Sequence, residues 1–462
     1  MKNIVLVHGW SVTNLDTYGG LPERLTAEAV QRGMDLHLEH IFLSRYISFH
    51  DEVTLADIAR AFEMALQERP ELDSFVCITH STGGPVVRLW WETYYAQRPS
   101  PISHLIMLAP ANFGSALAQL GKGKLSRIKS FFAGVEPGQG VLDWLELGSA
   151  PSWQLNQKWI EHGVDLLATG TYPFVLTGQS IDRAFYDHLN TYTGEMGTDG
   201  VVRTACAQLT SRYLRVEQVF NATGPTPAST LTYAQYTESP QVPLRVLAGK
   251  SHSGNEKGIM ASVTPSLDDT NSAETIQALF DCMAVDSPAA YKAVYQQFEA
   301  ATKAVQVAER EEHETSFHFF DTTYFHDVHS QLIFRVRDHE GHPVTDFDLL
   351  LTAGADSNPN YFPAGFAPDR QRNSKAPHTL TYYMNYSVLQ QISELGLRLF
   401  PRPDTGFVRY FPCELKASAD FYQKVLRPNS TTLVDIVVHR AVSKEVFRVD
   451  AANVGVERDF SS

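Results

Sequence analysis

The sequence of 462 residues contains four cysteines, no long apolar run and no block of basic residues. The cysteines stand far apart, at positions 77, 206, 282 and 413, so we expect reduced core residues rather than a disulfide framework. No run reaches the roughly 18 apolar residues of a membrane-spanning helix, and none is predicted. The apolar run at residues 4–7 is too short for a signal peptide. We therefore expect a protein that is cytoplasmic as synthesised.

The excess of acidic residues makes some classes of binding partner unfavourable. With 52 acidic and 38 basic residues, the formal net charge is -14. This charge argues against nucleic acid as a partner and gives anionic membranes no electrostatic attraction. Apolar residues make up 43% of the chain, enough to fill a large core, and the length predicts two or three domains.

Short apolar runs alternate with longer amphipathic stretches in the first 285 residues. The runs predict buried strands of a mostly parallel sheet, at residues 4–7, 36–42, 75–78, 104–108, 174–176 and 244–247. The stretches between them have apolar residues at helical spacing, at residues 21–31, 55–66 and 84–96. This order predicts a doubly wound α/β domain over residues 1–285, with helices on both faces of the sheet.

Residues 113–169 interrupt this order with a segment rich in leucine, phenylalanine and tryptophan. We expect a helical insertion between two strands. Because ligand pockets are mostly apolar, such an insertion could form a cap, a lid or the wall of an acyl pocket. The alternative is a plain helical layer packed on the sheet.

The pattern changes towards the C-terminus. A helical connector is expected over residues 286–312, after a helix at residues 273–282. From residue 313 onward the apolar residues alternate with period two between turn-forming residues, which predicts an antiparallel β-sandwich over residues 313–462. The expected strands are residues 317–320, 332–336, 347–351, 380–386, 397–400, 408–412 and 432–438.

The segment Thr-His-Ser-Thr-Gly at residues 79–83 joins the strand predicted at residues 75–78 to the next helix. A strand, a sharp turn and a helix can expose a serine hydroxyl in front of the first amide groups of the helix. The pattern is G-x-S-x-G, with Thr79 in place of the first glycine. Ser81 is therefore the candidate nucleophile for acyl transfer.

A nucleophilic serine needs a base to take its proton and a third group to orient that base. His252 lies in a loop of small residues after the last predicted strand, at the same edge of the sheet as Ser81, and is the candidate base. Asp199 lies between these two in the sequence and is the candidate orienting group. Asp182 and Asp187 are alternatives, because they lie nearer to the end of the strand predicted at residues 174–176. Asp199 could also simply form a turn, since Asp-Gly is a frequent turn dipeptide.

The oxyanion of the tetrahedral intermediate needs hydrogen-bond donors. One is expected to be the backbone N–H of Thr82, directly after the nucleophile, and the other that of Trp10, in the loop after the first strand. His8 and His80 are expected to hold these loops by hydrogen bonding rather than to act as the base.

Four elements of the sequence together resemble the serine lipases and esterases of the α/β-hydrolase superfamily. They are residues 8–10, residues 79–83, residues 198–202 and His252. A chain that begins directly at the oxyanion strand is similar to bacterial lipases and to the branch of lecithin-cholesterol acyltransferase and the GPI inositol-deacylases. The resemblance covers residues 1–285. It implies a carboxylic-ester hydrolase that acts on lipid-like acyl esters through an acyl-enzyme, without a cofactor.

The added β-domain also makes the chain similar to phospholipase effectors of type VI secretion, which implies export without a signal peptide. An acyltransferase or a thioesterase would use the same residues. A further alternative is a binding or adaptor protein whose hydrolase fold has lost its activity.

The second domain carries two weaker signals. Its histidines fit no zinc spacing. Asp338, Glu340 and Asp346 could bind calcium, but acidic residues in a turn are usually only solvated, so we predict no metal site. Five aromatic residues near expected loops could contact a membrane or a partner protein, or could simply pack in the core. They are Tyr324, Phe325, Tyr361, Phe362 and Phe366.

Overall fold

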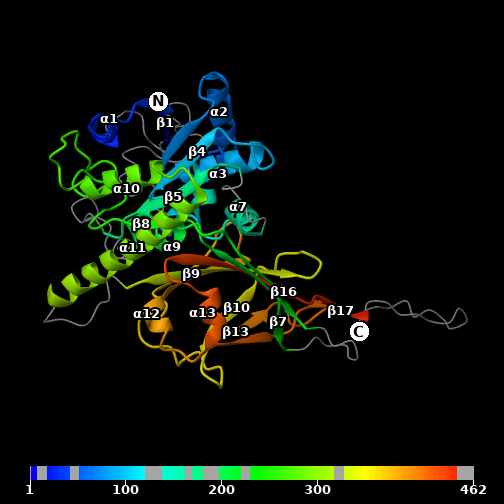
Figure 1. Ribbon diagram of the computed structural model, residues 1–462. Coiled ribbons are helices and arrows are strands. Elements are labelled where there is room, and N and C mark those ends of the chain that lie inside the picture. Colours follow the sequence, from blue (N-terminus) through cyan, green and yellow to red (C-terminus); the bar gives the residue numbers. More distant parts are fainter. Residues whose placement is uncertain are drawn as a thin grey trace, which may run out of the picture.

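The computed structural model of the chain describes residues 2–7, 18–41, 51–119, 138–161, 169–180, 197–219, 229–316 and 327–444. Figure 1 shows an α/β part in its upper half and a β-rich part below it. None of the helices within these ranges is both long and apolar enough to cross a membrane.

A parallel sheet of six strands forms the centre of the α/β part, in the order β2-β1-β3-β4-β5-β8. Its strands are β1 (Lys2–Val7), β2 (Leu36–Ile41), β3 (Phe75–His80), β4 (Ile102–Leu108), β5 (Tyr172–Thr177) and β8 (Leu244–Val246). All six strands predicted for residues 1–285 are present, and the predicted doubly wound α/β class is confirmed. We call these six strands the parallel sheet.

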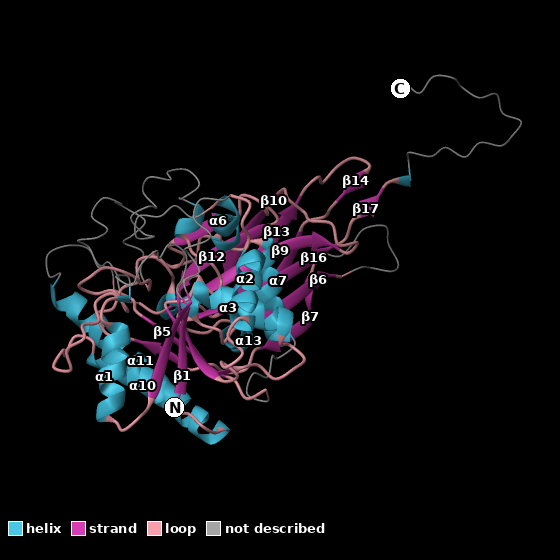
Figure 2. Ribbon diagram, turned by 90° about the horizontal axis from the view of Figure 1, so that it is seen from above, coloured by secondary structure: helices cyan, strands magenta, loops and turns pink. Residues whose placement is uncertain are grey.

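Helices cover both faces of the parallel sheet, as Figure 2 shows. One face packs against α1 (Leu21–Gln31), α10 (Ala273–Met283) and α11 (Pro288–Ser316), and the other against α2 (Leu55–Gln67) and α3 (Gly83–Tyr94). Because side chains alternate along a strand, Ile4 and Leu6 of β1 lie in one core and Val5 and Val7 in the other. Burial on both faces explains why these strands read as continuous apolar runs.

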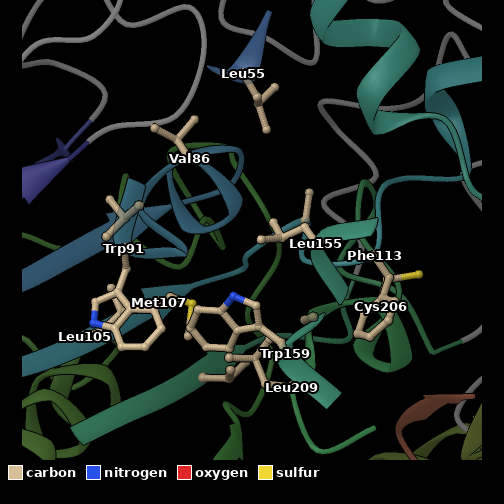
Figure 3. Close-up of a cluster of buried hydrophobic side chains, with 14 of the residues drawn as sticks. Leu55, Val86, Trp91, Leu105, Met107, Phe113, Leu155, Trp159, Cys206 and Leu209 are labelled. Atoms are coloured by element: carbon tan, nitrogen blue, oxygen red, sulfur yellow. The ribbon is translucent and has the colours of Figure 1, made fainter. Parts of the chain in front are cut away.

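The described part of the predicted insertion includes the helices α6 (Gln139–Leu145) and α7 (Ala150–Glu161). Their tryptophans Trp144, Trp153 and Trp159 are buried in the same core as the side chains of α2 and α3, part of which Figure 3 shows in close-up. These two helices therefore pack as a layer beside α2 and α3. Residues 120–137 and 162–168 of the insertion lie outside the described residues.

The β-rich part contains a second sheet of six strands, in the order β11-β12-β9-β16-β6-β7. Its strands are β6 (Arg212–Gln218), β7 (Leu231–Glu238), β9 (His329–Asp338), β11 (Asp369–Arg372), β12 (Thr379–Asn385) and β16 (Ser430–Val438). We call it the mixed sheet, because β16 pairs in parallel with both β6 and β9 while the other pairs are antiparallel.

A smaller antiparallel sheet packs against the mixed sheet across a shared apolar core. It consists of β10 (Phe347–Ala353), β13 (Glu394–Pro401) and β15 (Cys413–Ser418). Two sheets around one core agree with the predicted C-terminal β-sandwich. The short elements α9 (Thr204–Ala207), α12 (Tyr386–Leu389), α13 (Ala419–Val425), β14 (Val408–Arg409) and β17 (Ala441–Val442) complete the described chain.

The strands of the mixed sheet come from both sides of the connector that was predicted at residues 286–312. β6 and β7 precede that connector in sequence, yet β6 pairs with β16 of the C-terminal region and β7 pairs with β6. The sandwich is therefore not built from residues 313–462 alone, and it is not purely antiparallel. The predicted strand at residues 317–320 lies outside the described residues.

Candidate active site

Ser81 occupies the turn between β3 and α3, at the carboxyl edge of the parallel sheet. Its backbone has φ of 54°, a left-handed conformation that costs a non-glycine residue about 1–3 kcal/mol. Hydrogen bonds hold this conformation: Ser81 N–H donates to Leu108 O at 3.0 Å, and Ser81 O accepts from Gly84 N–H at 3.2 Å and Ala111 N–H at 3.3 Å. The predicted elbow is therefore formed.

Close packing explains the glycine that directly follows the elbow. A Cβ atom on Gly84 would lie 2.8 Å from Pro110 Cβ, closer than two carbon atoms can approach. Thr79, which stands where the pattern has its first glycine, is fully buried at the end of β3. The elbow thus accommodates a threonine at that position.

His252 faces Ser81 from the loop after β8. Its Nε2 lies 3.0 Å from Ser81 Oγ. The backbone of the loop is held as well, because His252 N–H donates to Asp199 O at 2.9 Å and His80 Nε2 donates to His252 O at 3.2 Å. His80 therefore contacts the loop that carries His252, and hydrogen bonding to a loop is the role expected of His80 from the sequence.

Asp199 lies on the other side of the imidazole and is fully buried. Its Oδ2 lies 2.9 Å from His252 Nδ1, while its Oδ1 accepts hydrogen bonds from Val201 N–H at 3.0 Å and Val202 N–H at 2.7 Å. The two backbone donors fix the carboxylate plane, so the second oxygen points at the ring. The alternatives Asp182 and Asp187 lie outside the described residues.

The two expected oxyanion donors have different outcomes. Thr82 is the residue immediately before α3, and its N–H makes no hydrogen bond with the described part of the chain. This N–H is thus available where a helix N-terminus favours negative charge. His8 and Trp10 lie outside the described residues.

Sequence reasoning missed the residues that hold the Asp199 loop from the mixed sheet. Tyr383 of β12 donates from its hydroxyl to Gly197 O at 3.3 Å. Arg203 donates to Gln331 Oε1 of β9 at 2.9 Å, forms an ion pair with Asp369 of β11, and lies 4.1 Å from the centre of the Tyr383 ring. No local sequence pattern marks these contacts, because each joins positions more than 100 residues apart.

A buried histidine belongs to the same contact. His329 stacks on Tyr383 with ring centres 4.6 Å apart. Burial lowers the pKa of His329 to about 4. Gly197 has φ of 67°, and a Cβ there would meet Tyr383 Oη at 2.6 Å and His329 Nδ1 at 3.0 Å. Only glycine fits this approach of the acid loop to the mixed sheet.

The three candidate calcium ligands are divided between two places in the structure. Asp338, Glu340 and His342 lie together, but among the described residues Asp338 already accepts hydrogen bonds from the backbone N–H groups of Glu340 and His342 and from the Tyr410 hydroxyl. Asp346 instead pairs with Arg402 at 3.1 Å.

Comparisons with known proteins find a strong similarity among solved structures. No protein-family model matches the chain, and no curated protein matches it. Among solved structures, the phospholipase PlaB from Legionella pneumophila is 39% identical, with a TM-score of 0.88 over 99% of this chain and 97% of that one. The same phospholipase in complex with thio-NAD is 38% identical, with a TM-score of 0.87 over 99% and 98% of the two chains.

Proposed function

This chain belongs to the family of the phospholipase PlaB, and from that premise we propose that it hydrolyses acyl esters of phospholipids with Ser81 as the nucleophile. It is an ester hydrolase with the α/β-hydrolase fold. The observation that carries the proposal is the hydrogen-bonded series of Asp199, His252 and Ser81 at the carboxyl edge of the parallel sheet.

In the proposed reaction, Ser81 Oγ attacks the acyl carbonyl while His252 Nε2 takes the hydroxyl proton. Asp199 holds Nδ1–H, which fixes the tautomer that leaves Nε2 free to accept. The Thr82 N–H, and the Trp10 N–H expected from sequence, donate to the oxyanion of the tetrahedral intermediate. His252 then protonates the departing alcohol, and water releases the fatty acid from Ser81 by the same steps in reverse order.

Replacement of the nucleophile tests this assignment. Ser81→Ala should lower the release of fatty acid from phosphatidylcholine vesicles by several powers of ten, since the acyl-enzyme cannot form. Ser266→Ala, at an exposed serine on a loop, is the matched control and should change the rate by about twofold at most.

Covalent labelling adds a second readout. A fluorophosphonate should attach to Ser81 at one equivalent per chain and abolish turnover. Turnover by the Ser81→Ala variant, or attachment at another residue, would refute the proposed nucleophile.

The substrate class is tested by a chain-length series. Hydrolysis of p-nitrophenyl esters is compared from short to long acyl chains, beside phosphatidylcholine vesicles. A phospholipase should hydrolyse the vesicles and favour long chains. Activity confined to short soluble esters would leave an ester hydrolase and exclude the phospholipid substrate.

We further propose that the β-rich part contacts the lipid surface through Tyr361. Among the five aromatic candidates, Tyr361 is 58% exposed, whereas Phe366 is buried and Phe362 stacks on it at 4.2 Å. Tyr324 and Phe325 lie outside the described residues. Tyr361→Ser should weaken sedimentation with vesicles while leaving hydrolysis of a short soluble ester unchanged. Equal sedimentation of the variant and the parent protein would exclude this contact.

A further inference from the structure

A cavity of about 550 Å³ lies apart from the three residues of the candidate active site. Its walls come from α2, α3, α6 and α7 and from residues 373–376 of the β-rich part. None of the residues Ser81, Asp199 and His252 lines this cavity. The residues of α3 that do, Leu89 and Glu92, lie about two to three helical turns beyond Ser81.

The wall of this cavity is mainly apolar. Leu55, Trp144 and Leu155 form its buried side, and the two leucines are labelled in Figure 3. Ala56 and Ala150 line it from exposed positions on α2 and α7. Its volume falls within the roughly 300–1,000 Å³ of known small-molecule sites, and junctions between domains are a common place for such sites.

Hydrogen bonds between the two parts of the molecule hold the wall in place. Asn373 Nδ2 donates to Leu147 O at 3.1 Å, and Ser374 Oγ donates to the Glu146 carboxylate at 2.8 Å. Thr379 Oγ1 donates to Gly148 O at 2.9 Å in the same segment. The cavity is therefore a fixed part of the junction.

The two lysines at the cavity differ in their partners. Lys158 pairs with Glu92 at 3.2 Å. The Asp143 carboxylate accepts a hydrogen bond at 2.7 Å from Gln139 Nε2, an amide group without charge. Lys375 also lines the cavity, is exposed, and makes no ion pair with any residue in the described ranges. An apolar wall beside one unpaired ammonium group suits a ligand with a hydrocarbon chain and an anionic head.

We propose that this cavity binds a long-chain fatty acid, with the hydrocarbon chain between α2 and α7 and the carboxylate at Lys375. The choice of a fatty acid rests on the proposed function, because fatty acid is the product of that reaction. The apolar wall and the unpaired lysine do not depend on it. A single-chain phospholipid, the other product, shares the hydrocarbon chain but carries its charge in a larger head group.

The test measures binding to the full chain after Ser81 has been blocked with a short-chain fluorophosphonate, so that the candidate active site is closed. Palmitate should displace a fluorescent fatty acid at one site per chain, and each methylene removed from the chain should weaken binding roughly threefold to fourfold. Hexadecanol and lysophosphatidylcholine should bind more weakly than palmitate. Tighter binding of lysophosphatidylcholine would overturn the assignment to fatty acid.

Two pairs of variants locate the site. Ala56→Trp fills the cavity from an exposed helical position and should weaken palmitate binding at least tenfold, whereas Ala61→Trp, exposed on the same helix outside the cavity, should not change it. Lys375→Gln should weaken the binding of palmitate but not of hexadecanol, with Lys292→Gln of α11 as the control.

The outcomes separate this inference from the proposed function. Equal binding by the Ala56→Trp and Ala61→Trp variants, or loss of binding when Ser81 is blocked, would overturn the second site. Failure of the fluorophosphonate to label Ser81 would instead count against the proposed nucleophile. Palmitate binding would then be measured on the unblocked chain with the same variants.

Discussion

The parallel sheet and the mixed sheet contribute to the candidate active site in different ways. The parallel sheet presents Ser81 after β3 and His252 after β8, each through a turn at the end of a strand. The mixed sheet presents none of the three residues, but β9 and β12 contact the loop that carries Asp199. One sheet therefore positions the nucleophile and the base, and the other holds the acid in reach of the base.

The mixed sheet also has two buried faces. Leu433 and Ile333 belong to the core shared with α2, α3 and α7, whereas the next residues, Val434 and Phe334, belong to the core shared with the small sheet. On the side of the α/β part, Arg335 of β9 lies 4.4 Å from the centre of the Trp153 ring of α7. The β-rich part is thus joined to the α/β part by core packing, which an appended docking module would not need.

Removal of the β-rich part should have the largest effect. Deletion of residues 313–462 takes β16 away from β6 and exposes the core residues that Leu433 and Ile333 cover. We expect the shortened chain to lose cooperative thermal unfolding and all hydrolysis of a short soluble ester. Cooperative unfolding with retained hydrolysis would mean that residues 313–462 serve only for docking.

Substitution of the acid should have the next largest effect. Asp199→Asn keeps the size of the side chain and an oxygen for the two backbone donors, but it favours the wrong tautomer of His252. We expect kcat for a short ester to fall by about 10⁴-fold, with a nearly unchanged melting temperature. A fall of less than about tenfold would transfer the orienting role to Asp182 or Asp187.

The contrast between the sheets also explains what could be predicted from sequence. The strands of the parallel sheet and the turn at Ser81 follow from patterns that span fewer than about 15 residues, namely apolar runs, helical spacing and the elbow. β6 and β7 join the mixed sheet through the pairing of β6 with β16, which lies more than 200 residues further along the chain, and no local pattern encodes that pairing.

The same limit applies to the contacts of the acid loop. Asp199 was predicted because it lies between the serine and the histidine in the sequence. Its support from Arg203 and Tyr383 depends on how the two sheets pack. In the sequence, Tyr383 is only one residue of a strand that is mostly apolar and aromatic. The aromatic residues near Phe366 were ambiguous for a related reason, because composition alone does not separate a core side chain from an exposed one.

The pH dependence of stability tests the buried histidine at this contact. The pKa of His329 is lowered from 6.5 to about 4 by burial, so below about pH 6.5 the unfolded chain binds a proton that the folded chain does not. The titration of His329 therefore leaves the free energy of unfolding unchanged above about pH 6.5. As the pH falls from about 6.5 to about 4, this titration lowers the free energy of unfolding by about 1.4 kcal/mol per pH unit.

Removal of the imidazole should remove this dependence. His329→Gln should flatten the decline in the free energy of unfolding between about pH 6.5 and 4, measured by urea denaturation of the variant and the parent protein. Acidic groups titrate in both proteins, so the difference between the two curves isolates His329. Parallel curves would show that His329 binds its proton equally well in the folded and the unfolded chain.

The smallest change tests whether the mixed sheet affects catalysis beyond stability. Tyr383→Phe removes the hydrogen bond to Gly197 O but keeps the ring between Arg203 and His329, and should cost about 1 kcal/mol of stability. Its neighbour Tyr382 donates to Leu349 O at 2.9 Å, in the core shared with the small sheet. Tyr382→Phe is therefore a matched control that removes one hydrogen bond on the other face of the same strand.

We expect both variants to lose a similar amount of stability, but only Tyr383→Phe to lower kcat, by a few-fold, with KM for a short ester unchanged. The reason is that Gly197 lies two residues from Asp199, so a looser loop lowers the fraction of chains in which Asp199 and His252 are correctly aligned. If the two variants had the same kcat as the parent protein, the mixed sheet would stabilise the molecule without positioning the acid.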